Sequence, residues 1–507
     1  LSSLPTKRFR HRQHDGLWGG PSPLSTGGAQ PNLHHPLSKG GTEFHAPGTH
    51  WYHAHRHGST GLQVSNGMAG AIIIRERPEY QIVSPPDDKI WIIQEIIPPS
   101  QTDENQQDKD LAVYQRGGIA GGGTQGDFLV NGRFQPTITL QARQIQRWRF
   151  INANATPRGF MKLKLLKIND DPNTPPSSSD DLDPTKGALA PLWLIAVDGI
   201  SFYGKPPTLI GCNGNAEGCD GWDVAAGNRA DFLVQLDPGW YKVVKDTSGA
   251  AQGGSTAAQV LAYVKVEPSP AGSNEQTIPE KVPGIPLESP DNPYKRYLRP
   301  ITDAEITKEE ERSIVFSSTG RGTYLINGDQ YNPVLSDVTV DLGACEQWSL
   351  TTTIPQGRPP FGGAAHPFHI HVNPFQIVGD KIDSNGPDEP SNWRFWDTIA
   401  VPVPGSNDPK IKIRSRFVDY SGTFVFHCHI LIHEDQGMMK NITVKNTAPV
   451  KWPDMPYKGT LPEGVGAPPC TSLSNDSQYV MGPALRKVFR QGGDKCKPLP
   501  PIPPSFS

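Results

Sequence analysis

Three consecutive residues, His427-Cys428-His429, combine side chains that commonly bind transition metals. They follow Thr423-Phe424-Val425-Phe426, an alternating apolar run that predicts a buried strand entering a turn. Neighbouring side chains on a strand point to opposite faces, so the two imidazoles share one face and the Cys428 sulfur points to the other. This segment therefore predicts two metal sites joined by a few covalent bonds, an arrangement suited to electron transfer between metal centres.

The cysteine has further candidate ligands close by in the sequence. His433 and Met438 follow Cys428 after five and ten residues, so a turn can bring both back to the sulfur. Two imidazoles, one thiolate and a weak axial thioether form the ligand set of a blue-copper electron-transfer site. His366, which opens a second histidine cluster, is the natural supplier of the second imidazole. We therefore predict a copper site on this face of the strand.

Two other histidine pairs repeat the same-face spacing of a strand. They are His53 and His55, within Trp51-Tyr52-His53-Ala54-His55-Arg56-His57, and His369 and His371, within His366-Pro367-Phe368-His369-Ile370-His371. One such pair is weak support for a metal site, because isolated histidines are more often core or surface residues. Three pairs, one of them enclosing a cysteine, are far more specific. His50 and His57 lie outside this register and are expected behind the ligands or on the surface.

These motifs resemble those of three-domain multicopper oxidases, the family that includes laccases and bacterial copper oxidases. The resemblance covers residues 40–445 and is carried by Gly48-Thr49-His50-Trp51-Tyr52-His53-Ala54-His55, by the cluster that opens at His366, and by the segment from His427 to Met438. It implies an all-β fold of three cupredoxin-like Greek-key barrel or sandwich domains. It also implies up to four copper ions per chain, of which one is type 1, one type 2 and two type 3.

The resemblance further assigns roles to individual residues. The type 1 copper would take His366, Cys428 and His433 with Met438 axial; one type 3 copper would take His55, His371 and His427, the other His53 and His429; and the type 2 copper would take His369. Glu434 is similar to a carboxylate placed as a proton relay in bacterial relatives. The alternative is that the Glu434 carboxylate merely orients His433 or its neighbours.

Two ligands that the family would supply are missing near the amino end. Relatives carry a His-x-His-Gly motif upstream of Trp-Tyr-His-x-His, whereas this chain has Arg10-His11-Arg12-Gln13-His14. His11 and His14 are three residues apart and His34 and His35 are adjacent, so neither pair shares a strand face. We expect a truncated or altered first domain, which leaves the type 2 copper and one type 3 copper each one histidine short.

Length and composition agree with a chain of several β domains. The 507 residues suggest two to four domains, and 52 Gly and 52 Pro without long helical periodicity favour short strands linked by turns. Two segments also repeat an aromatic-Leu-aliphatic-Asn-Gly turn followed by a proline and a Trp-centred strand. They run from Phe128-Leu129-Val130-Asn131-Gly132 to Trp148 and from Tyr324-Leu325-Ile326-Asn327-Gly328 to Trp348. Each copy is expected to open a β domain.

Segments rich in Pro, Ser and charge suggest the domain boundaries. We predict a partial first domain at 1–85, a second domain at 86–290, a third at 291–448 and a Pro-rich tail at 449–507. The second domain contains no histidine cluster and is expected to be a spacer and cleft wall. Its segment 166–188, rich in Asp, Pro and Ser, is expected to be a mobile insertion.

Charge and cysteine usage narrow the environment. The net charge of −3 carries no basic stripe for nucleic acid, and no apolar run is long enough to span a bilayer. Besides Cys428 there are five cysteines, of which Cys212 with Cys219 and Cys470 with Cys496 could close loops. Cysteines outside a metal site suggest an oxidising compartment, so a secreted or periplasmic location is expected.

The resemblance implies a laccase-like oxidase. A small-molecule phenol or aromatic amine would give up single electrons at the type 1 copper, and O2 would be reduced to water at the trinuclear cluster. A metal-ion oxidase acting on Cu(I) or Fe(II) is the first alternative, although the six Met residues are scattered. A copper-binding or electron-transfer protein with an incomplete trinuclear site is the second.

Overall fold

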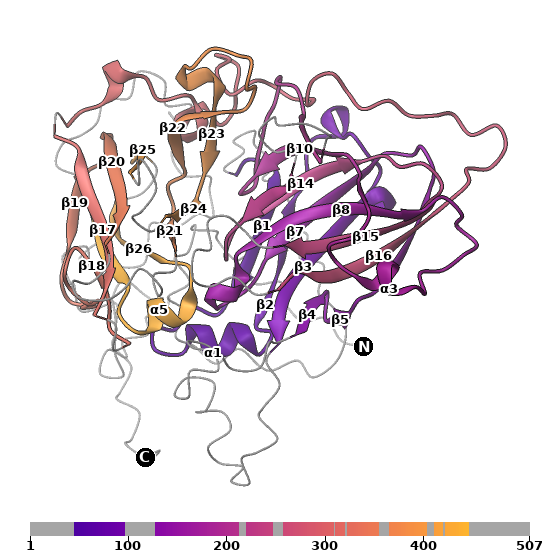
Figure 1. The fold of residues 1–507 in the computed structure, drawn as a ribbon. Coiled ribbons are helices and arrows are strands. Elements are labelled where there is room, and N and C mark those ends of the chain that lie inside the picture. Colours follow the sequence, from indigo (N-terminus) through magenta and orange to yellow (C-terminus); the bar gives the residue numbers. More distant parts are fainter. Residues whose placement is uncertain are drawn as a thin grey trace, which may run out of the picture.

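The computed structural model describes residues 45–96, 127–211, 220–246, 257–308, 310–319, 322–353, 365–402, 410–418 and 421–445. Strands dominate these residues and the helices are short, as predicted for an all-β chain. The strands form two double-layered β-sandwiches with a two-stranded ribbon between them (Figure 1).

The ribbon is the described part of the predicted first domain. It consists of β1 (Gly48–His53) and β2 (Ala69–Ile74), which pair in antiparallel register from Gly48 opposite Ile74 to His53 opposite Ala69. One face, with Trp51, packs on Ile92 and Ile151 of the neighbouring sandwich. This packing fixes the strand that carries His53 against the second domain.

The second predicted domain is a sandwich of an eight-stranded and a six-stranded sheet. The larger sheet contains β3 (Asp88–Ile96), β4 (Asp127–Val130), β5 (Arg133–Phe134), β7 (Gln146–Asn152), β10 (Leu192–Val197), β11 (Ile200–Ser201), β12 (Thr208–Ile210) and β14 (Arg229–Val234). The smaller contains β6 (Thr137–Gln141), β8 (Met161–Asn169), β9 (Ala188–Leu189), β13 (Trp222–Val224), β15 (Gly239–Asp246) and β16 (Gln259–Glu267).

The third predicted domain is a sandwich of a six-stranded and a five-stranded sheet. The first contains β17 (Arg312–Ser318), β18 (Tyr324–Ile326), β20 (Cys345–Thr352), β22 (Phe375–Lys381), β23 (Trp393–Trp396) and β25 (Ile411–Arg416). The second contains β19 (Val338–Asp341), β21 (His366–Ile370), β24 (Thr398–Val401), β26 (Gly422–Cys428) and β27 (Met439–Lys445). The histidine clusters of this domain lie on the five-stranded sheet.

Short helices connect the strands. They are α1 (Thr60–Ser65), α3 (Ser179–Leu182), α4 (Lys295–Leu298) and α5 (Leu431–Asp435), with single 3-10 turns at Pro78–Tyr80, Pro85–Asp87, Pro157–Gly159, Asp303–Glu305 and Pro390–Asn392. Helices α1 and α5 lie side by side although they are far apart in the sequence (Figure 1). Asp435 joins them, because its carboxylate accepts hydrogen bonds from the backbone N–H groups of Thr60 and Gly61 at 3.0 and 2.8 Å.

The predicted sequence repeat is also a repeat in three dimensions. Asn131 and Asn327 both have positive φ and each is followed by a glycine with positive φ, as the tight Asn-Gly turn requires. The Asn131 side chain accepts from Ile92 N at 2.9 Å, and the Asn327 side chain accepts from Val315 N at 2.8 Å. The two segments therefore share the turn that the sequence repeat predicted.

Each repeat ends in a strand with a central buried tryptophan. Trp148 on β7 and Trp348 on β20 are almost wholly buried. Each indole N–H donates to the side chain two residues earlier, Gln146 at 3.1 Å and Glu346 at 2.8 Å. A buried indole N–H is stabilised by such a partner, and the two strands provide it in the same way.

The expectation of a mobile insertion at 166–188 is wrong, because the segment forms defined elements. Helix α3 has a capping box in which Ser178 and Asp181 satisfy each other's backbone N–H groups. Lys242 then donates to the backbone carbonyls of Asp181 and Asp183 at 2.9 and 2.6 Å. The acidic composition supplies caps and lysine contacts here and does not produce disorder.

The predicted domain boundaries at 85/86 and 290/291 stay predictions, although no described strand crosses either of them.

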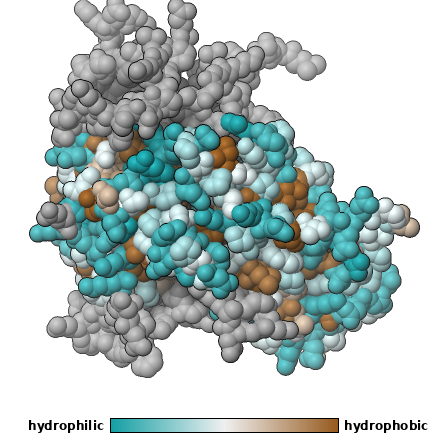
Figure 2. Space-filling view, turned by 90° about the horizontal axis from the view of Figure 1, so that it is seen from above, coloured by the Kyte–Doolittle hydropathy of each residue, from teal (hydrophilic) through white to brown (hydrophobic). Residues whose placement is uncertain are grey.

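Among the described residues no helix is long and apolar enough to cross a membrane. The face seen in Figure 2 carries hydrophobic residues scattered among hydrophilic ones. That distribution is ordinary for a globular surface.

Candidate metal centres

Strands β26 and β21 position most of the predicted ligands. They pair antiparallel, with Cys428 opposite Phe368 and His427 opposite His369. The Cys428 side chain lies in the main hydrophobic core together with Phe426 and Phe368. The imidazoles of His427 and His429 lie in a separate cluster of histidine rings, as the period-two spacing predicted.

The sulfur cluster consists of His366, Cys428 and His433. Cys428 Sγ lies 3.5 Å from His366 Nδ1 and 3.8 Å from His433 Nδ1, and the two nitrogens are 3.3 Å apart. Met438 is fully buried in the same core, and its carbonyl accepts from Cys428 N at 3.0 Å. The structure thus brings three of the predicted type 1 ligands together, and the role of Met438 as the axial ligand stays a prediction.

Aromatic rings enclose this cluster. Phe316 stacks on His366, and Tyr324 stacks on His433 with ring centroids 3.8 Å apart and planes inclined at 16°. His366 and His433 are only 5% and 4% exposed. The half-buried Tyr324 ring therefore covers His433.

The nitrogen cluster consists of His55, His371 and His427, one from the predicted first domain and two from the third. Their Nε2 atoms lie 3.1, 3.1 and 3.2 Å from one another. Two of these histidines lie just beyond the ends of strands: β1 ends at His53 and β21 ends at Ile370. The three predicted ligands of one type 3 copper therefore converge.

Both clusters have the geometry that a metal ion requires. Nitrogens held about 2 Å from one ion in tetrahedral geometry lie ~3.3 Å apart, close to the separations found here. Burial lowers the pKa of His371, His427 and His433 well below its ordinary value and that of His366 to about 3. Neutral imidazoles are the form that binds metals, so the buried donor sets fit copper.

The remaining predicted ligands are His53, His369 and His429. Their rings are neighbours, with centroids 5.3 Å apart for His53 and His429 and for His369 and His429. Nδ1 of His429 is buried without a hydrogen-bond partner. The described residues do not bring these three together in a close group of ligand atoms comparable with the two clusters above. Their assignment as ligands stays a prediction.

The two further histidines expected from the family are not found among the described residues. Of the unassigned histidines there, His50 lies against Gly199, and His57 packs on Tyr331 with ring centroids 4.8 Å apart. The four amino-terminal candidates His11, His14, His34 and His35 lie outside the described residues. The expected shortage of ligands therefore holds for the part of the chain that the structure covers.

Glu434 lies next to the nitrogen cluster. Its Oε1 atom is 3.7 Å from His55 Nδ1 and 3.8 Å from His57 Nδ1, and Thr60 Oγ1 donates to the same oxygen at 3.4 Å. The carboxyl is fully buried, and burial raises its pKa to about 7. The Glu434 side chain approaches His55 of the nitrogen cluster. This position suits the role of a proton relay better than the role of a carboxylate that only orients His433.

Asp397 contacts a predicted ligand, His369. His369 Nδ1 donates to the Asp397 carbonyl at 2.8 Å and lies 3.6 Å from its Oδ1. Burial opposes ionisation of Asp397, but the charge of Arg229 and a hydrogen bond with His369 hold its pKa well below the ordinary value. The signal in the sequence was the position of Asp397 immediately before a strand, which says nothing about its long-range partner.

The predicted loop-closing cysteines Cys212, Cys219, Cys470 and Cys496 lie outside the described residues. Cys345 is free and buried on β20, and burial raises the pKa of its thiol.

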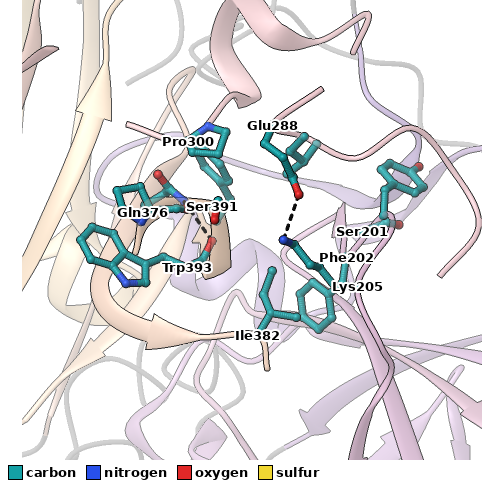
Figure 3. Close-up of a pocket in the computed structure, with 13 residues that line it drawn as sticks. Ser201, Phe202, Lys205, Glu288, Pro300, Gln376, Ile382, Ser391 and Trp393 are labelled. Carbon is teal, nitrogen blue, oxygen red and sulfur yellow. Dashed lines mark hydrogen bonds and ion pairs between the residues drawn. The ribbon is translucent and has the colours of Figure 1, made fainter. Parts of the chain in front are cut away.

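A narrow crevice lies between the second and third domains (Figure 3). It is lined by Phe202, Ile382 and Trp393, and an ion pair of Lys205 with Glu288 at 2.9 Å closes it. None of its lining residues belongs to either cluster, so we assign it to packing between domains.

Comparison with known proteins gives one consistent class. Residues 299–448, the third domain, match the multicopper oxidase family model. Over 401 residues the chain is 25% identical to multicopper oxidase mco of Staphylococcus haemolyticus, covering 78% of this chain and 68% of that protein. Over 426 residues it is 24% identical to a laccase of Bacillus subtilis, covering 78% and 70%.

Solved structures agree on the fold. The McoA multicopper oxidase 2F4 variant from Aquifex aeolicus superimposes with a TM-score of 0.55 and 21% identity, over 79% of this chain and 76% of that chain. The fold and the two donor clusters define a cupredoxin-type copper protein. The family model over the third domain, the related multicopper oxidases and laccases, and the two donor clusters together indicate a bacterial-type multicopper oxidase, a copper-dependent oxidoreductase.

Proposed function

We propose that the protein is a laccase-like oxidase that takes single electrons from phenols or aromatic amines and passes them to O2. The observation that supports this most is the pair of clusters joined by adjacent residues, with Cys428 in one and His427 in the other. Copper held by these clusters would supply one-electron oxidation of the donor and reduction of O2, with four electrons and four protons giving two waters.

The donor end of this scheme is the Tyr324 face of the sulfur cluster. A planar aromatic donor can pack against the half-buried Tyr324 ring, which itself stacks on His433. The ring excludes water from His433 and gives a donor an apolar platform. A donor would therefore exchange electrons through the edge of this histidine without entering the core.

The acceptor end is the nitrogen cluster and its carboxylic acid. Reduction of O2 consumes protons, and Glu434 can hold one at a carboxyl oxygen within 4 Å of His55. His57 is the outward neighbour of Glu434, and its side chain is 24% exposed. A proton can thus pass from solvent to the cluster by way of His57 and Glu434.

Two other functions remain open to test. A metal-ion oxidase would take Cu(I) or Fe(II) as its donor; the six Met residues of the chain are spread along it, which supports this function less. An electron-transfer protein would use the sulfur cluster alone. The observation favouring it is that His53, His369 and His429 form no close ligand group among the described residues.

Copper stoichiometry with optical and EPR spectra tests these functions together. Four copper ions per chain, absorption near about 600 nm from a copper–thiolate site and a type 2 EPR signal would support the oxidase. One copper per chain with no O2 uptake on phenols would refute it in favour of the electron-transfer protein. O2 uptake on Cu(I) or Fe(II) but not on phenols would select the metal-ion oxidase.

A further inference from the structure

Arg229 of the second domain bonds to all three domains. It opens β14 and is 3% exposed, and a guanidinium has five N–H donors in a fixed plane. All five are used: Nε donates to Thr49 O at 3.2 Å, Nη1 to Gly227 O at 3.0 Å and Asp397 Oδ1 at 2.8 Å, and Nη2 to Asp198 O at 2.9 Å and Asp397 Oδ2 at 2.5 Å. Thr49 belongs to the first domain and Asp397 to the third.

Asp397 carries this arrangement to His369. His369 Nδ1 donates to the Asp397 carbonyl, and Thr398 Oγ1 lies 3.0 Å from the same nitrogen while donating to Asp397 Oδ1 at 2.8 Å. A carbonyl oxygen only accepts, so the proton of the neutral imidazole is on Nδ1. Nε2 of His369 is then the nitrogen with a free lone pair, the one that can bind a metal.

Asp198 fixes the backbone on which His369 depends. Its Oδ2 atom accepts from the N–H groups of Asp397 and Thr398 at 3.1 and 3.0 Å, and Asn228 donates to both Asp198 oxygens at 3.1 Å. Asn228 also donates to the Thr398 carbonyl at 2.8 Å. Residues 397 and 398 are therefore held on both sides by the second domain.

The same turn touches a second predicted ligand. Gly227 has φ +90, and a Cβ placed on it would lie 2.6 Å from the His429 ring. The turn 227–229 thus packs its backbone on His429 and directs the Arg229 side chain toward the support of His369. Both histidines belong to the group that lacks a complete set of partners in the described residues.

We propose that Arg229 is a positioning residue of the copper centre, which clamps Asp397 so that His369 presents Nε2 to the metal. The inference rests on the proposed role of His369 as a copper ligand and deepens it. The second domain, expected to be only a spacer and cleft wall, supplies the support of a ligand that another domain carries. A lysine cannot replace Arg229, because an ammonium has three donors and no planar fork for the two Asp397 oxygens.

The test compares Arg229→Lys with Arg147→Lys in the full chain loaded with copper. Arg147 is a matched control: it lies on the neighbouring strand β7, is 4% exposed and pairs with Glu76 at 2.5 Å and Asp231 at 2.7 Å. Among the described residues its guanidinium donates to Glu76 and Asp231, and to neither a histidine nor Asp397. Both variants should keep the wild-type blue absorption. Arg229→Lys should lose or shift the type 2 EPR signal and bind fewer copper ions, whereas Arg147→Lys should keep both.

The inference is overturned if Arg229→Lys keeps the wild-type EPR signal and copper content, or if both variants lose them equally. Should Arg229→Lys fail to fold, Asp397→Asn replaces it and the same outcomes decide. Asn keeps the backbone carbonyl of residue 397 but offers the guanidinium one uncharged acceptor in place of two carboxylate oxygens. A wild type that binds copper without a type 2 signal refutes the proposed function. A wild type with that signal and unchanged variants refutes the positioning role alone.

Discussion

The Tyr324 ring stacks on the His433 ring with a centroid separation of 3.8 Å and an angle of 16° between the planes. Removing that ring admits water to His433. Water stabilises the more highly charged Cu(II) state, so Tyr324→Ala should lower the reduction potential of the blue copper by tens of millivolts, on the order of 1 kcal/mol. Tyr324→Phe keeps the ring and should leave the potential close to wild type. Redox titration of the blue absorption decides, and equal potentials for the two variants would contradict the shielding role.

Replacing Cys428 should remove the blue colour without unfolding the protein. Cys428→Ser removes the thiolate but keeps a small polar side chain, so the blue absorption and all turnover should disappear while circular dichroism stays that of a β protein. Cys345→Ser is the matched control, because Cys345 is the other free and buried cysteine of the described residues. It should keep colour and turnover. Persistence of the blue band in Cys428→Ser would show that the ligand assignment is wrong.

Gly227 should be sensitive to a single added methyl group. Gly227→Ala forces a side chain into a left-handed conformation, which costs about 1–2 kcal/mol, and also drives Cβ into the His429 ring. Gly132→Ala has the same backbone cost at φ +74 but meets nothing within 4 Å. Both variants should lose conformational stability, Gly227→Ala by more because of the contact with His429, and only Gly227→Ala should lose the copper EPR signals that depend on His429. Copper analysis with thermal unfolding of each variant checks this.

Glu434→Gln should slow the oxygen half of the reaction. The amide is close in shape to the acid but cannot hand over a proton beside His55, so steady-state O2 uptake should fall by roughly 10²-fold, the usual scale of general-acid catalysis. Anaerobic reduction of the blue copper by a phenol should keep its wild-type rate. If O2 uptake and anaerobic reduction of the blue copper slow equally, Glu434 stabilises the structure of the site and does not deliver protons.

Lys245 should make stability depend on pH in the alkaline range. The side chain is fully buried, and burial lowers its pKa from 10.5 to about 8, so between these values the folded chain binds fewer protons than the unfolded chain. Stability therefore rises from pH 8 to 10.5, and below pH 8 the buried charge costs roughly 3 kcal/mol. Lys245→Met should be more stable than wild type at pH 7, by an amount that shrinks toward pH 10.5.

Urea unfolding midpoints at several pH values measure that difference. Lys186→Met, at an exposed lysine, is the control and should show no pH-dependent gain. Glu95 keeps Arg158 as a partner at 3.3 Å when Lys245 is replaced, so the substitution leaves no unpaired carboxylate. A constant stability difference across the pH range would contradict the assigned titration.

Local pattern was enough to predict the arrangement around Cys428. Alternation over Phe424–Phe426 predicted a strand with the cysteine and the histidines on opposite faces, and β26 has that arrangement. The Asn131 and Asn327 turns were equally readable, because an Asn-Gly pair fixes its own backbone. Such features depend on residues next to each other in the chain.

Contacts between distant residues could not be derived in this way. The same-face spacing of His53 and His55 did not specify their partners: His55 lies with His371 and His427 and His53 beside His429, the grouping that the family resemblance implied. The bond of Arg229 to Asp397 spans 168 residues and leaves no periodic signal. Composition misled at 166–188, where acidic residues cap a helix and bind Lys242.

The two clusters differ in what must be folded before they exist. His366, Cys428 and His433 come from a single antiparallel pair of strands and the adjoining helix, all in the third domain. His55 comes from the first domain, and the support of His369 comes from the second. During maturation the sulfur site can thus form as soon as one domain is complete, whereas the imidazole site also requires the domains to dock. The chain should become blue before it becomes able to consume oxygen.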